Sequence, residues 1–462
     1  MGVGAYVSRI FTSNYIERFI EVELLLGFIG GISVPFLYFA FVQLDYTSFS
    51  WLIIFLIFVI GLLTGLEIPL LTKLLEKHFP SDVNLSNVLS LDYLGALAAT
   101  LLFPFFLLPW VGVFLSSLLF GLVNVAVGIF NFWLFKDRIN PKRKKGYYVV
   151  ITLISLFFLT AIPLSSKLLA QWHNQLYRDR IVLSETTPYQ TIVLTKANND
   201  LRLYINRVIQ FSTLDEYRYH ESLIQIPMAL APFKKRVLIL GGGEALAARE
   251  VLKHPDVEEV HIVDIDPAIF EIAVENRHLK RINQAALENP KVKPIPMDAM
   301  VYLKEAEELY DVIIADLPDP SNDNIARLYS NEFYKLVKSK LSPNGIFVTQ
   351  ATSVYHTNEA FWCINSTVKK AGFKNVKPYH AYVPSFGDWG FIMASNNEIN
   401  VEEINLGNLK LKFLEQDKIP NLFSFNKDIV KTGIPSSSLD QPILLDLYLK
   451  GWQKWSREKV VF

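Results

Sequence analysis

A glycine-rich turn with a carboxylate directly behind it is the part of this sequence that most clearly indicates chemistry. Three glycines at 241–243 follow the apolar run 237–240, and Glu244 follows the glycines. The apolar run predicts a buried parallel strand, and the glycines let the backbone turn tightly and approach a ligand where a helix begins. Asp264, 23 positions after the first glycine, stands where the second strand of a βαβ unit presents a carboxylate to ribose hydroxyls. Because Glu244 would repel phosphate, a cationic ligand attached to an adenosine fits this turn better than a dinucleotide.

Further acidic residues stand at the ends of later predicted strands. Strands alternate with helices from Val237 onward, which predicts a doubly wound parallel sheet, and ligands of such sheets bind beyond the carboxyl ends of the strands. The predicted strands after the glycine turn cover residues 260–263, 292–295, 312–315 and 345–350. Asp298 and Asp316 follow two of them, and Asp319 lies three positions further along a loop with two prolines. Two carboxylates on such a rigid loop favour a site over an ordinary turn, whereas Asp298 also fits a helix N-cap.

The first 165 residues differ in composition and are dominated by Leu, Phe, Ile, Val and Gly. Five apolar segments there have approximately the length, roughly 20 residues, that a membrane-spanning helix needs. They cover residues 24–42, 51–71, 88–109, 111–135 and 147–163. Because four of these runs follow one another with very short polar links, we expect a transmembrane helical bundle rather than the buried helices of a soluble protein.

Asp92 lies within the third apolar segment, four residues from its start. Carboxylates in a membrane are costly and usually face a partner or an aqueous cavity. Two interpretations stay open: a polar site for a cationic amine, or a residue at the helix end that bonds to a neighbouring helix.

The sequence predicts four parts: a multi-pass transmembrane domain at 1–165, a polar amphipathic linker at 166–184, a small β subdomain with a helix at 185–230, and a Rossmann-like domain with a C-terminal tail at 231–462. Alternating apolar residues from Ile181 to Gln210 indicate a small antiparallel sheet. The expected fold is therefore an all-α transmembrane bundle, followed by an α/β doubly wound domain of the methyltransferase type with a small N-terminal antiparallel sheet.

Charge and cysteine content exclude some classes of function. Lys plus Arg and Asp plus Glu number 45 each, so no basic field indicates a nucleic-acid partner. The single Cys363 excludes an internal disulfide and a cysteine-based metal site, and we expect it to pack in the core.

Taken together, the motifs resemble the spermidine synthase family of polyamine aminopropyltransferases over residues from about 185 to 395. The resemblance is carried by residues 189–190, 209–210, 215–221, 241–244, 249–255, 264–267, 298–299 and 316–320. This ordered set is far more specific than any one motif. Residues 65–71 and 89–96 resemble the multi-pass membrane branch of that family. That branch usually begins with further spans, and because residues 1–9 resemble the tail of one, we expect a shortened N-terminus.

The resemblance implies a reaction of the spermidine synthase type. The aminopropyl group of decarboxylated S-adenosylmethionine passes to putrescine when an acceptor nitrogen attacks the methylene next to the sulfonium. Methylthioadenosine then leaves and spermidine forms. No metal or cofactor is implied, because the sulfonium is already an activated leaving group. Carboxylates suit this chemistry, since the site must hold two cations close together and remove a proton from one amine.

Residue by residue, the resemblance assigns Asp316 as the proton acceptor. The implied nucleoside contacts are Gln190, Asp264, Asp298 and Ala299. The implied contacts with the aminopropyl arm and the acceptor amine are Tyr219, His220, Glu244 and Asp319. For His220, a solvent-exposed histidine on a helix is the alternative.

The sequence also departs from the family pattern. Glu244 and Ala245 replace an Asp-Gly pair, which keeps the charge but lengthens the side chain and removes the conformational freedom of glycine. The aromatic residues near 382–391 are more closely spaced than in soluble members, so the sequence does not assign the aromatic lining of the site. Both departures bear on the choice of acceptor more than on the type of reaction.

Two other functions stay open. An S-adenosylmethionine-dependent methyltransferase would share the fold, but Glu244 would repel the carboxylate of its donor. A membrane transporter or sensor of polyamines could keep a binding domain, although the presence of Asp316 favours an enzyme.

The expected partners are the two substrates, the lipid bilayer and a second copy of the chain, and the expected location is the cell membrane. Two observations disagree about the side of the membrane on which the soluble part lies. Lys and Arg gather in the second and fourth links between spans, which places those links and the N-terminus in the cytoplasm and, after five spans, the soluble part outside. A nucleoside substrate made in the cytoplasm argues for the cytoplasmic side, which we favour.

Overall fold

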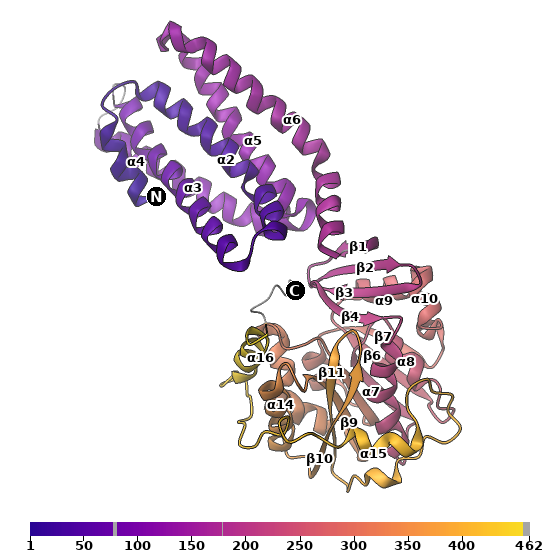
Figure 1. The fold of residues 1–462 in the computed structure, drawn as a ribbon. Coiled ribbons are helices and arrows are strands. Elements are labelled where there is room, and N and C mark those ends of the chain that lie inside the picture. Colours follow the sequence, from indigo (N-terminus) through magenta and orange to yellow (C-terminus); the bar gives the residue numbers. More distant parts are fainter. Residues whose placement is uncertain (77–80, 178, 456–462) are drawn as a thin grey trace. The chain divides into compact units, whose positions relative to one another are not determined.

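The fold comes from a computed structural model, which describes residues 1–76, 81–177 and 179–455. The chain divides into two compact units, Met1–Asp179 and Arg180–Phe462. The first unit is helical and the second is α/β, and each is described by itself (Figure 1).

Five long helices make up most of the first unit. They are α2 (Tyr15–Gln43), α3 (Tyr46–Leu75), α4 (Ser81–Leu102), α5 (Leu108–Phe135) and α6 (Pro141–Tyr177), with short segments at α1 (Gly2–Val7), η1 (Ser8–Ile10), η2 (Phe103–Leu107) and η3 (Lys136–Arg138). Each long helix contains a stretch apolar and long enough to cross a membrane, with mean hydropathy between 1.6 and 2.6. The predicted bundle of apolar helices is confirmed.

Glycines allow α2 and α5 to pack closely. A Cβ added to Gly27 would lie 2.8 Å from the carbonyl oxygen of Gly121, and one added to Gly121 would lie 2.5 Å from the Cα of Gly31. Small residues at a helix crossing let the backbones approach, which favours association in a membrane, where apolar burial cannot drive it.

The boundary between the two units, at Asp179 and Arg180, lies within the predicted linker at 166–184. Most of that range is not irregular, however, because α6 continues to Tyr177 and β1 begins at Arg180. Trp172 is buried and packs on Tyr38 of α2, with ring centroids 4.4 Å apart, and Leu169 joins the same apolar cluster. The amphipathic stretch that suggested a linker is thus the last part of a helix that packs along one face.

Asp92 also lies deeper in its helix than the sequence suggested. Since α4 begins at Ser81, Asp92 comes eleven positions after the first helical residue. The interpretation of Asp92 as a helix-end residue is therefore wrong.

The second unit begins with the predicted small antiparallel sheet. Its strands, in the order β1 (Arg180–Thr186), β2 (Thr191–Ala197), β3 (Asp200–Ile205) and β4 (Val208–Ser212), are each antiparallel to the next. Alternate residues such as Ile192 and Leu194 pack with Ile269 and Ile272 of the following domain. The small sheet is thereby fixed next to that domain.

A seven-stranded sheet forms the centre of the second unit, in the order β10-β11-β9-β8-β5-β6-β7. Its strands are β5 (Arg236–Gly241), β6 (Glu259–Asp264), β7 (Val292–Pro296), β8 (Tyr310–Asp316), β9 (Leu341–Ser353), β10 (Asn375–Val383) and β11 (Gly387–Ser395). The first five are parallel, as predicted, whereas β11 runs antiparallel to β9 and to β10.

Helices cover both faces of this sheet. The longer ones are α7 (Glu216–Leu230), α9 (Pro267–Glu275), α13 (Asn331–Ser339), α14 (Asn358–Lys370) and α16 (Ile443–Gln453); the shorter ones are α8 (Leu246–Val251), α10 (Arg277–Ile282), α11 (Ala299–Glu305), α12 (Asp323–Ala326) and α15 (Ile419–Leu422). Val237 and Ile239 of β5 join one buried apolar cluster, and Leu238 and Leu240 join another. Because successive side chains of a strand point to opposite faces, these two clusters are the two sides of the predicted doubly wound sheet.

Candidate active site

A cavity of about 490 Å³ lies at the carboxyl ends of β5, β6 and β8, and the small sheet contributes to its wall. All nine residues singled out from the sequence line it: Gln190, Tyr219, His220, Glu244, Asp264, Asp298, Ala299, Asp316 and Asp319. The lining contains five carboxylates and one arginine, Arg327. The cavity is therefore acidic although the whole chain is neutral.

The glycine turn brings two strand ends into contact. Gly241 and Gly242 have φ angles of +84° and +65°, and a Cβ at Gly241 would lie 2.1 Å from the carbonyl oxygen of Asp316. A side chain at Gly241 would therefore push β8 away from β5. Ala245 has a φ of +68°, a left-handed conformation that glycine adopts more easily, so the departure from the family's Asp-Gly pair leaves local strain in the backbone.

Asp264 is held by backbone donors at the end of β6. The N–H of Gly243 donates to its Oδ2 at 3.2 Å, and the N–H of Asp266 donates to its Oδ1 at 3.1 Å. Burial raises the pKa of Asp264 to about 6. Gln190 is brought near by Thr187, whose hydroxyl accepts from the Gln190 N–H and donates to Asp266 at 2.8 Å.

Asp298 fulfils the role of helix cap that the sequence left open. Its Oδ1 accepts from the backbone N–H groups of Met300 and Val301, at 2.9 and 3.1 Å, at the start of α11. Its Oδ2 pairs with Arg327 of η5 (Arg327–Tyr329). Asp298 thus both caps α11 and lines the cavity, and Arg327 is already paired with its carboxylate.

Tyr219, His220, Glu244 and Asp316 come together at the centre of the cavity. The Tyr219 hydroxyl donates to Oδ1 of Asp316 at 2.6 Å, and Nε2 of His220 lies 3.9 Å from Oε1 of Glu244. One ligand atom from each of His220, Glu244 and Asp316 lies within 4.8 Å of the other two. His220 is only 2% exposed, which excludes a surface histidine. This trio has the charge and spacing to surround a small cation or an ammonium group.

The electrostatics of this group follow from burial. Burial, with the charge of Asp316, raises the pKa of Glu244 to about 7. Burial also raises the pKa of Asp316 above its ordinary value, opposed by His220 and by the Tyr219 hydrogen bond. Two carboxyls this close resist losing both protons. A cation placed between them would favour their ionised forms.

Behind His220 lies an ion pair to which the sequence assigned no role. Arg249 binds Glu216 through two nitrogens, at 3.0 and 2.9 Å, and Oε2 of Glu216 lies 2.9 Å from Nδ1 of His220. A proton on Nδ1 would bond to Glu216, so Nε2 faces the cavity. Burial would lower the pKa of His220, but the hydrogen bond and charge of Glu216 raise it overall. The four-residue spacing of Glu216 and His220 on one helix was the available signal.

Asp319 is held by residues that the sequence did not single out. Oδ2 of Asp319 accepts from Tyr448 of α16 at 3.0 Å and from Thr352 at 3.3 Å, and Gln350 donates to its Oδ1 at 3.4 Å. Burial raises the pKa of Asp319 to about 6. Tyr448 lies 129 positions along the chain from Asp319, which is why no local pattern indicated it.

The aromatic lining that the sequence left unassigned consists of Phe386 and Trp389, from the β10–β11 hairpin. Phe386 makes an edge contact with Tyr219, with ring centroids 5.9 Å apart, and Trp389 donates its Nε1–H to Gln350 at 3.2 Å. These rings provide an apolar wall beside the carboxylates, which suits the methylene chain of an amine.

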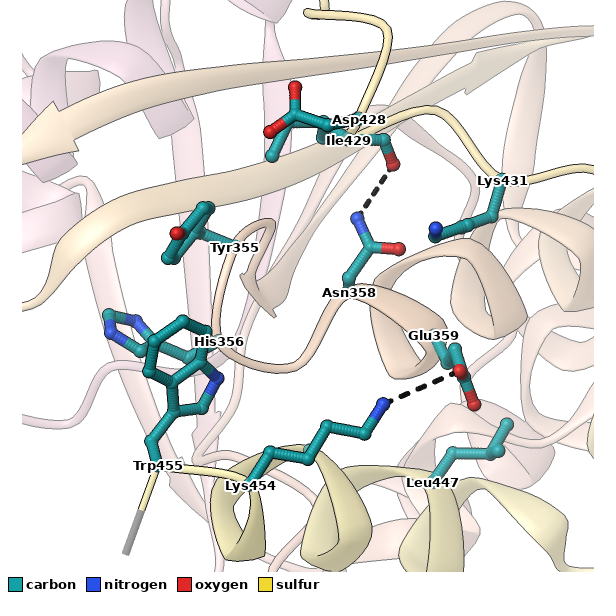
Figure 2. Close-up of a pocket in the computed structure, with 11 residues that line it drawn as sticks. Tyr355, His356, Asn358, Glu359, Asp428, Ile429, Lys431, Leu447, Lys454 and Trp455 are labelled. Atoms are coloured by element: carbon teal, nitrogen blue, oxygen red, sulfur yellow. Dashed lines mark hydrogen bonds and ion pairs between the residues drawn. The ribbon is translucent and has the colours of Figure 1, made fainter. Parts of the chain in front are cut away.

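A second cavity, of about 220 Å³, is lined by residues in and next to α14 and α16 and by Asp428, Ile429 and Lys431 (Figure 2). Figure 2 shows Lys454 paired with Glu359, 3.6 Å apart, and the Asn358 amide donating to the carbonyl of Ile429 at 2.6 Å. It contains two carboxylates and two lysines and none of the motif residues. The acidic cavity is therefore the better candidate for an active site.

Residues 216–405 match the spermine/spermidine synthase domain. The chain is 37% identical over 457 residues to the polyamine aminopropyltransferase of Leptospira interrogans, and the alignment covers 98% of this chain and 90% of that protein. The chain belongs to the polyamine aminopropyltransferase family. The polyamine aminopropyltransferase of Mycobacterium tuberculosis is 38% identical over 470 residues, and that alignment covers 98% of this chain and 88% of the other protein.

Similarity to the Leptospira protein includes the apolar helices of the first unit, because the alignment covers 98% of this chain and so extends through both units. Among solved structures, a spermidine synthase in complex with the transition state analogue AdoDATO has a TM-score of 0.51 and 24% identity, covering 54% of this chain and 87% of that one. This second likeness concerns the fold of the aminopropyltransferase unit.

Proposed function

We propose that this chain transfers the aminopropyl group of decarboxylated S-adenosylmethionine to putrescine, giving methylthioadenosine and spermidine. The observation that carries the proposal is the acidic cavity, in which Glu244, Asp264, Asp316 and Asp319 meet at the strand ends. Both substrates are cations, and such a cavity attracts them and disfavours phosphates and carboxylates.

In the proposed binding mode, Asp264 accepts hydrogen bonds from the ribose hydroxyls, and Gln190 contacts the nucleoside from the small sheet. Asp298 and Ala299 contact the adenine at the start of α11. Because Asp298 already caps the helix and pairs with Arg327, its position is fixed before the donor binds. Glu244 pairs with the ammonium at the end of the aminopropyl arm.

The acceptor lies between Asp316 and Asp319, with Tyr219, His220 and the aromatic wall along its length. Its nitrogen lone pair attacks the methylene next to sulfur, the C–S bond breaks with its electrons staying on sulfur, and the nitrogen proton passes to Asp316. Asp319 binds the distant ammonium. Holding nucleophile and leaving group in line supplies much of the acceleration, and a positioned base contributes a further factor of about 10²–10⁴.

The proposed reaction needs no metal or redox cofactor. His220, Glu244 and Asp316 have a spacing that a metal ion could also use, so this point needs its own test. Turnover that is unchanged by EDTA and by added Mg²⁺ supports an ammonium at this position. Loss of turnover with EDTA, restored by a metal, would contradict the assignment.

The direct test uses the full-length chain in detergent, with decarboxylated S-adenosylmethionine and putrescine, and detects the products by mass spectrometry. Methylthioadenosine and spermidine in equal amounts are expected. Product from spermidine but none from putrescine would make the acceptor a longer amine. A methylated amine formed from S-adenosylmethionine would favour a methyltransferase instead.

We also propose that the helices hold the protein in the cell membrane with the catalytic unit on the cytoplasmic side, where the nucleoside donor is made. A fluorescent protein fused to the C-terminus should then fluoresce, whereas a fused alkaline phosphatase should be inactive. The opposite pair of results would place the catalytic unit outside. We further infer a homodimer, which light scattering of the purified protein tests.

A further inference from the structure

Asp319 is a cavity carboxylate that only neutral groups hold. It is buried, lines the acidic cavity and has no ion pair with any residue that the structure describes. Its Oδ2 accepts from two hydroxyls, those of Tyr448 at 3.0 Å and Thr352 at 3.3 Å, whereas its Oδ1 has one contact, with Gln350 at 3.4 Å. Oδ1 is therefore the oxygen left for a ligand, and the negative charge is left for a cation to balance.

The shorter of these two hydroxyl contacts comes from outside the matched domain. Tyr448 belongs to α16, whereas the synthase domain matches residues 216–405. Tyr448 is 7% exposed and is not part of the cavity lining. It therefore contacts the carboxylate but no substrate, and any effect that it has on a substrate must pass through Asp319.

Close packing fixes the position of α16. Leu444, Tyr448 and Gly451 are its buried residues, at the four- and three-residue spacing of one side of a helix. A Cβ added to Gly451 would lie 2.9 Å from the Cα of Thr357, so the helix packs closely on the segment after β9. The hydroxyl of Thr357 shares a hydrogen bond of 2.9 Å with that of Thr352. Helix and segment thus bring both hydroxyls to the same carboxylate oxygen.

The backbone that leads to Asp319 is held as well. The hydroxyl of Tyr329 donates to the carbonyl of Pro318 at 2.9 Å, and the Gln350 amide donates to the carbonyl of Leu317 at 2.7 Å. Tyr329 is fully buried and Gln350 is 2% exposed. The side chain and the loop of Asp319 are therefore both fixed before a substrate binds.

Two carboxylates at a fixed separation can select a diamine by its length. In the proposed function, Asp316 takes the proton of the attacking nitrogen and Asp319 binds the distant ammonium. Tyr219 orients the first carboxylate and Tyr448 orients the second. A diamine that is one methylene too short or too long cannot meet both carboxylates, and it loses a charge-assisted hydrogen bond.

We propose that Tyr448 is a positioning residue that sets the length of the accepted diamine, because it holds Asp319 at a fixed distance from Asp316. This inference rests on the proposed function for the placement of the acceptor between the two carboxylates. The site should then prefer putrescine over its shorter and longer homologues, 1,3-diaminopropane and cadaverine. That preference should depend on one hydroxyl outside the cavity lining.

The test measures, by calorimetry, the binding of the three diamines to the full-length chain in detergent, loaded with methylthioadenosine. Tyr448→Phe keeps the ring and removes the hydroxyl. Putrescine binding should then weaken at least about tenfold, since a hydrogen bond to a charged group is lost, and the preference among the three diamines should largely disappear. In turnover with the donor, the KM for putrescine should rise while kcat changes much less, because Asp316 is untouched.

The pH dependence of putrescine binding separates positioning from packing. Burial raises the pKa of Asp319 to about 6, and the hydrogen bond from Tyr448 opposes this rise. Tyr448→Phe should therefore raise that pKa further and move the acidic limb of binding to higher pH. The other titratable groups that face Asp319 are Tyr219 and Tyr329, and burial raises the pKa of both well above the ordinary value. Neither tyrosine changes charge near neutral pH.

Tyr379→Phe is the matched control. Tyr379 is buried, lies outside the cavity lining and donates to a backbone carbonyl, that of Ser222, at 2.9 Å. Its diamine preference should equal that of the native chain. In a chain that already has Asp319→Asn, adding Tyr448→Phe should change putrescine binding little, since the two residues act as one unit. If Tyr448→Phe does not fold by circular dichroism, Tyr448→Met replaces it, because methionine fills irregular space.

The same diamine preference in Tyr448→Phe as in the native chain would overturn the inference. Equal binding of the three diamines to the native chain would do so too, as would an equal loss in Tyr379→Phe. Release of methylthioadenosine by the native chain, from the donor and putrescine, tests the proposed function separately. A chain that selects putrescine through Tyr448 but transfers nothing would support the inference and contradict the reaction.

Discussion

The hydroxyl of Tyr219 donates a hydrogen bond of 2.6 Å to Oδ1 of Asp316. The other oxygen, Oδ2, lies beside the glycine turn, where a Cβ added to Gly242 would be 3.2 Å away. The hydrogen bond favours the ionised carboxylate and so opposes the rise in pKa that burial causes. Tyr219 therefore orients the group that we propose as the base and, together with His220, lowers its proton affinity.

Asp316→Asn should abolish transfer while leaving donor binding nearly intact. An amide cannot accept the proton of the attacking amine, so kcat should fall by about 10²–10⁴-fold. Rapid-quench kinetics measures kcat, and calorimetry measures the dissociation constant of the donor. Asp323→Asn is a suitable control, because Asp323 is exposed and outside the cavity lining. Turnover of Asp316→Asn within about threefold of the native chain would show that the base is another group.

Tyr219→Phe should move the acidic limb of the kcat profile to higher pH. The hydrogen bond from Tyr219 lowers the pKa of Asp316, so its loss raises that pKa, and the base then needs a higher pH to be ionised. A hydrogen bond to a charged group contributes about 1.5–3 kcal/mol, which corresponds to a shift of about one pH unit or more. Tyr334→Phe, at a buried tyrosine outside the cavity lining, should leave the profile unchanged. An unshifted profile in Tyr219→Phe would separate Tyr219 from the proton transfer.

Donor affinity should rise with pH between about 5.5 and 8. Burial raises the pKa of Asp264 to about 6 and that of Glu244, with the charge of Asp316, to about 7. Below these values the carboxyls are mostly neutral, and a cation binds them weakly; above them they are ionised. The ammonium of the donor, with a pKa near that of lysine at about 10.4, stays charged throughout.

Calorimetry of decarboxylated S-adenosylmethionine and of methylthioadenosine isolates the contribution of Glu244. Both nucleosides depend on Asp264, but only the first has an ammonium for Glu244. The ratio of their affinities should therefore increase through pH 7 in the native chain and stay flat in Glu244→Gln. A ratio independent of pH in the native chain would remove Glu244 from the aminopropyl contact.

Glu244→Gln should also weaken discrimination against S-adenosylmethionine. That nucleoside differs by a carboxylate, which Glu244 repels at short range and low dielectric. Competition binding should show the two affinities approaching each other in the variant. An unchanged ratio would mean that the choice of donor is made elsewhere in the cavity.

The sequence predicted the cavity well because its residues stand at strand ends, where local patterns are clear. The glycine turn, Asp264 and the Asp316–Asp319 loop each follow an apolar run, and the parallel order of the strands brings their ends together. The partners of these residues were not predictable in this way. Arg249 binds Glu216, which is the partner of His220, and Tyr448 binds Asp319. These partners are far apart in the sequence and meet only in the folded structure.

The hairpin of β10 and β11 is the part of the sheet that the sequence did not predict. Its strands contain Pro378 and Gly390, which weaken a strand pattern, and the expected sheet was wholly parallel. Pro378 is accommodated because β10 is the edge strand, where a missing N–H donor costs little. The hairpin supplies Phe386 and Trp389, so the aromatic wall could not be assigned before the topology was known.

The catalytic unit should fold and act without the membrane helices. A chain that begins within the predicted linker, at Gln171, would keep the end of α6, where Trp172 packs on Tyr38 of the first unit. Freed of that partner, Trp172 would add to an exposed apolar patch. A chain beginning at Arg180, at the boundary of the two units, avoids this, because every residue of the acidic cavity lies after it. Circular dichroism, donor binding and methylthioadenosine release in detergent-free buffer check the prediction, with the full-length chain in detergent as reference. If the shorter chain folds and binds donor but makes no product while the full-length chain does, then the membrane helices contribute to the active site.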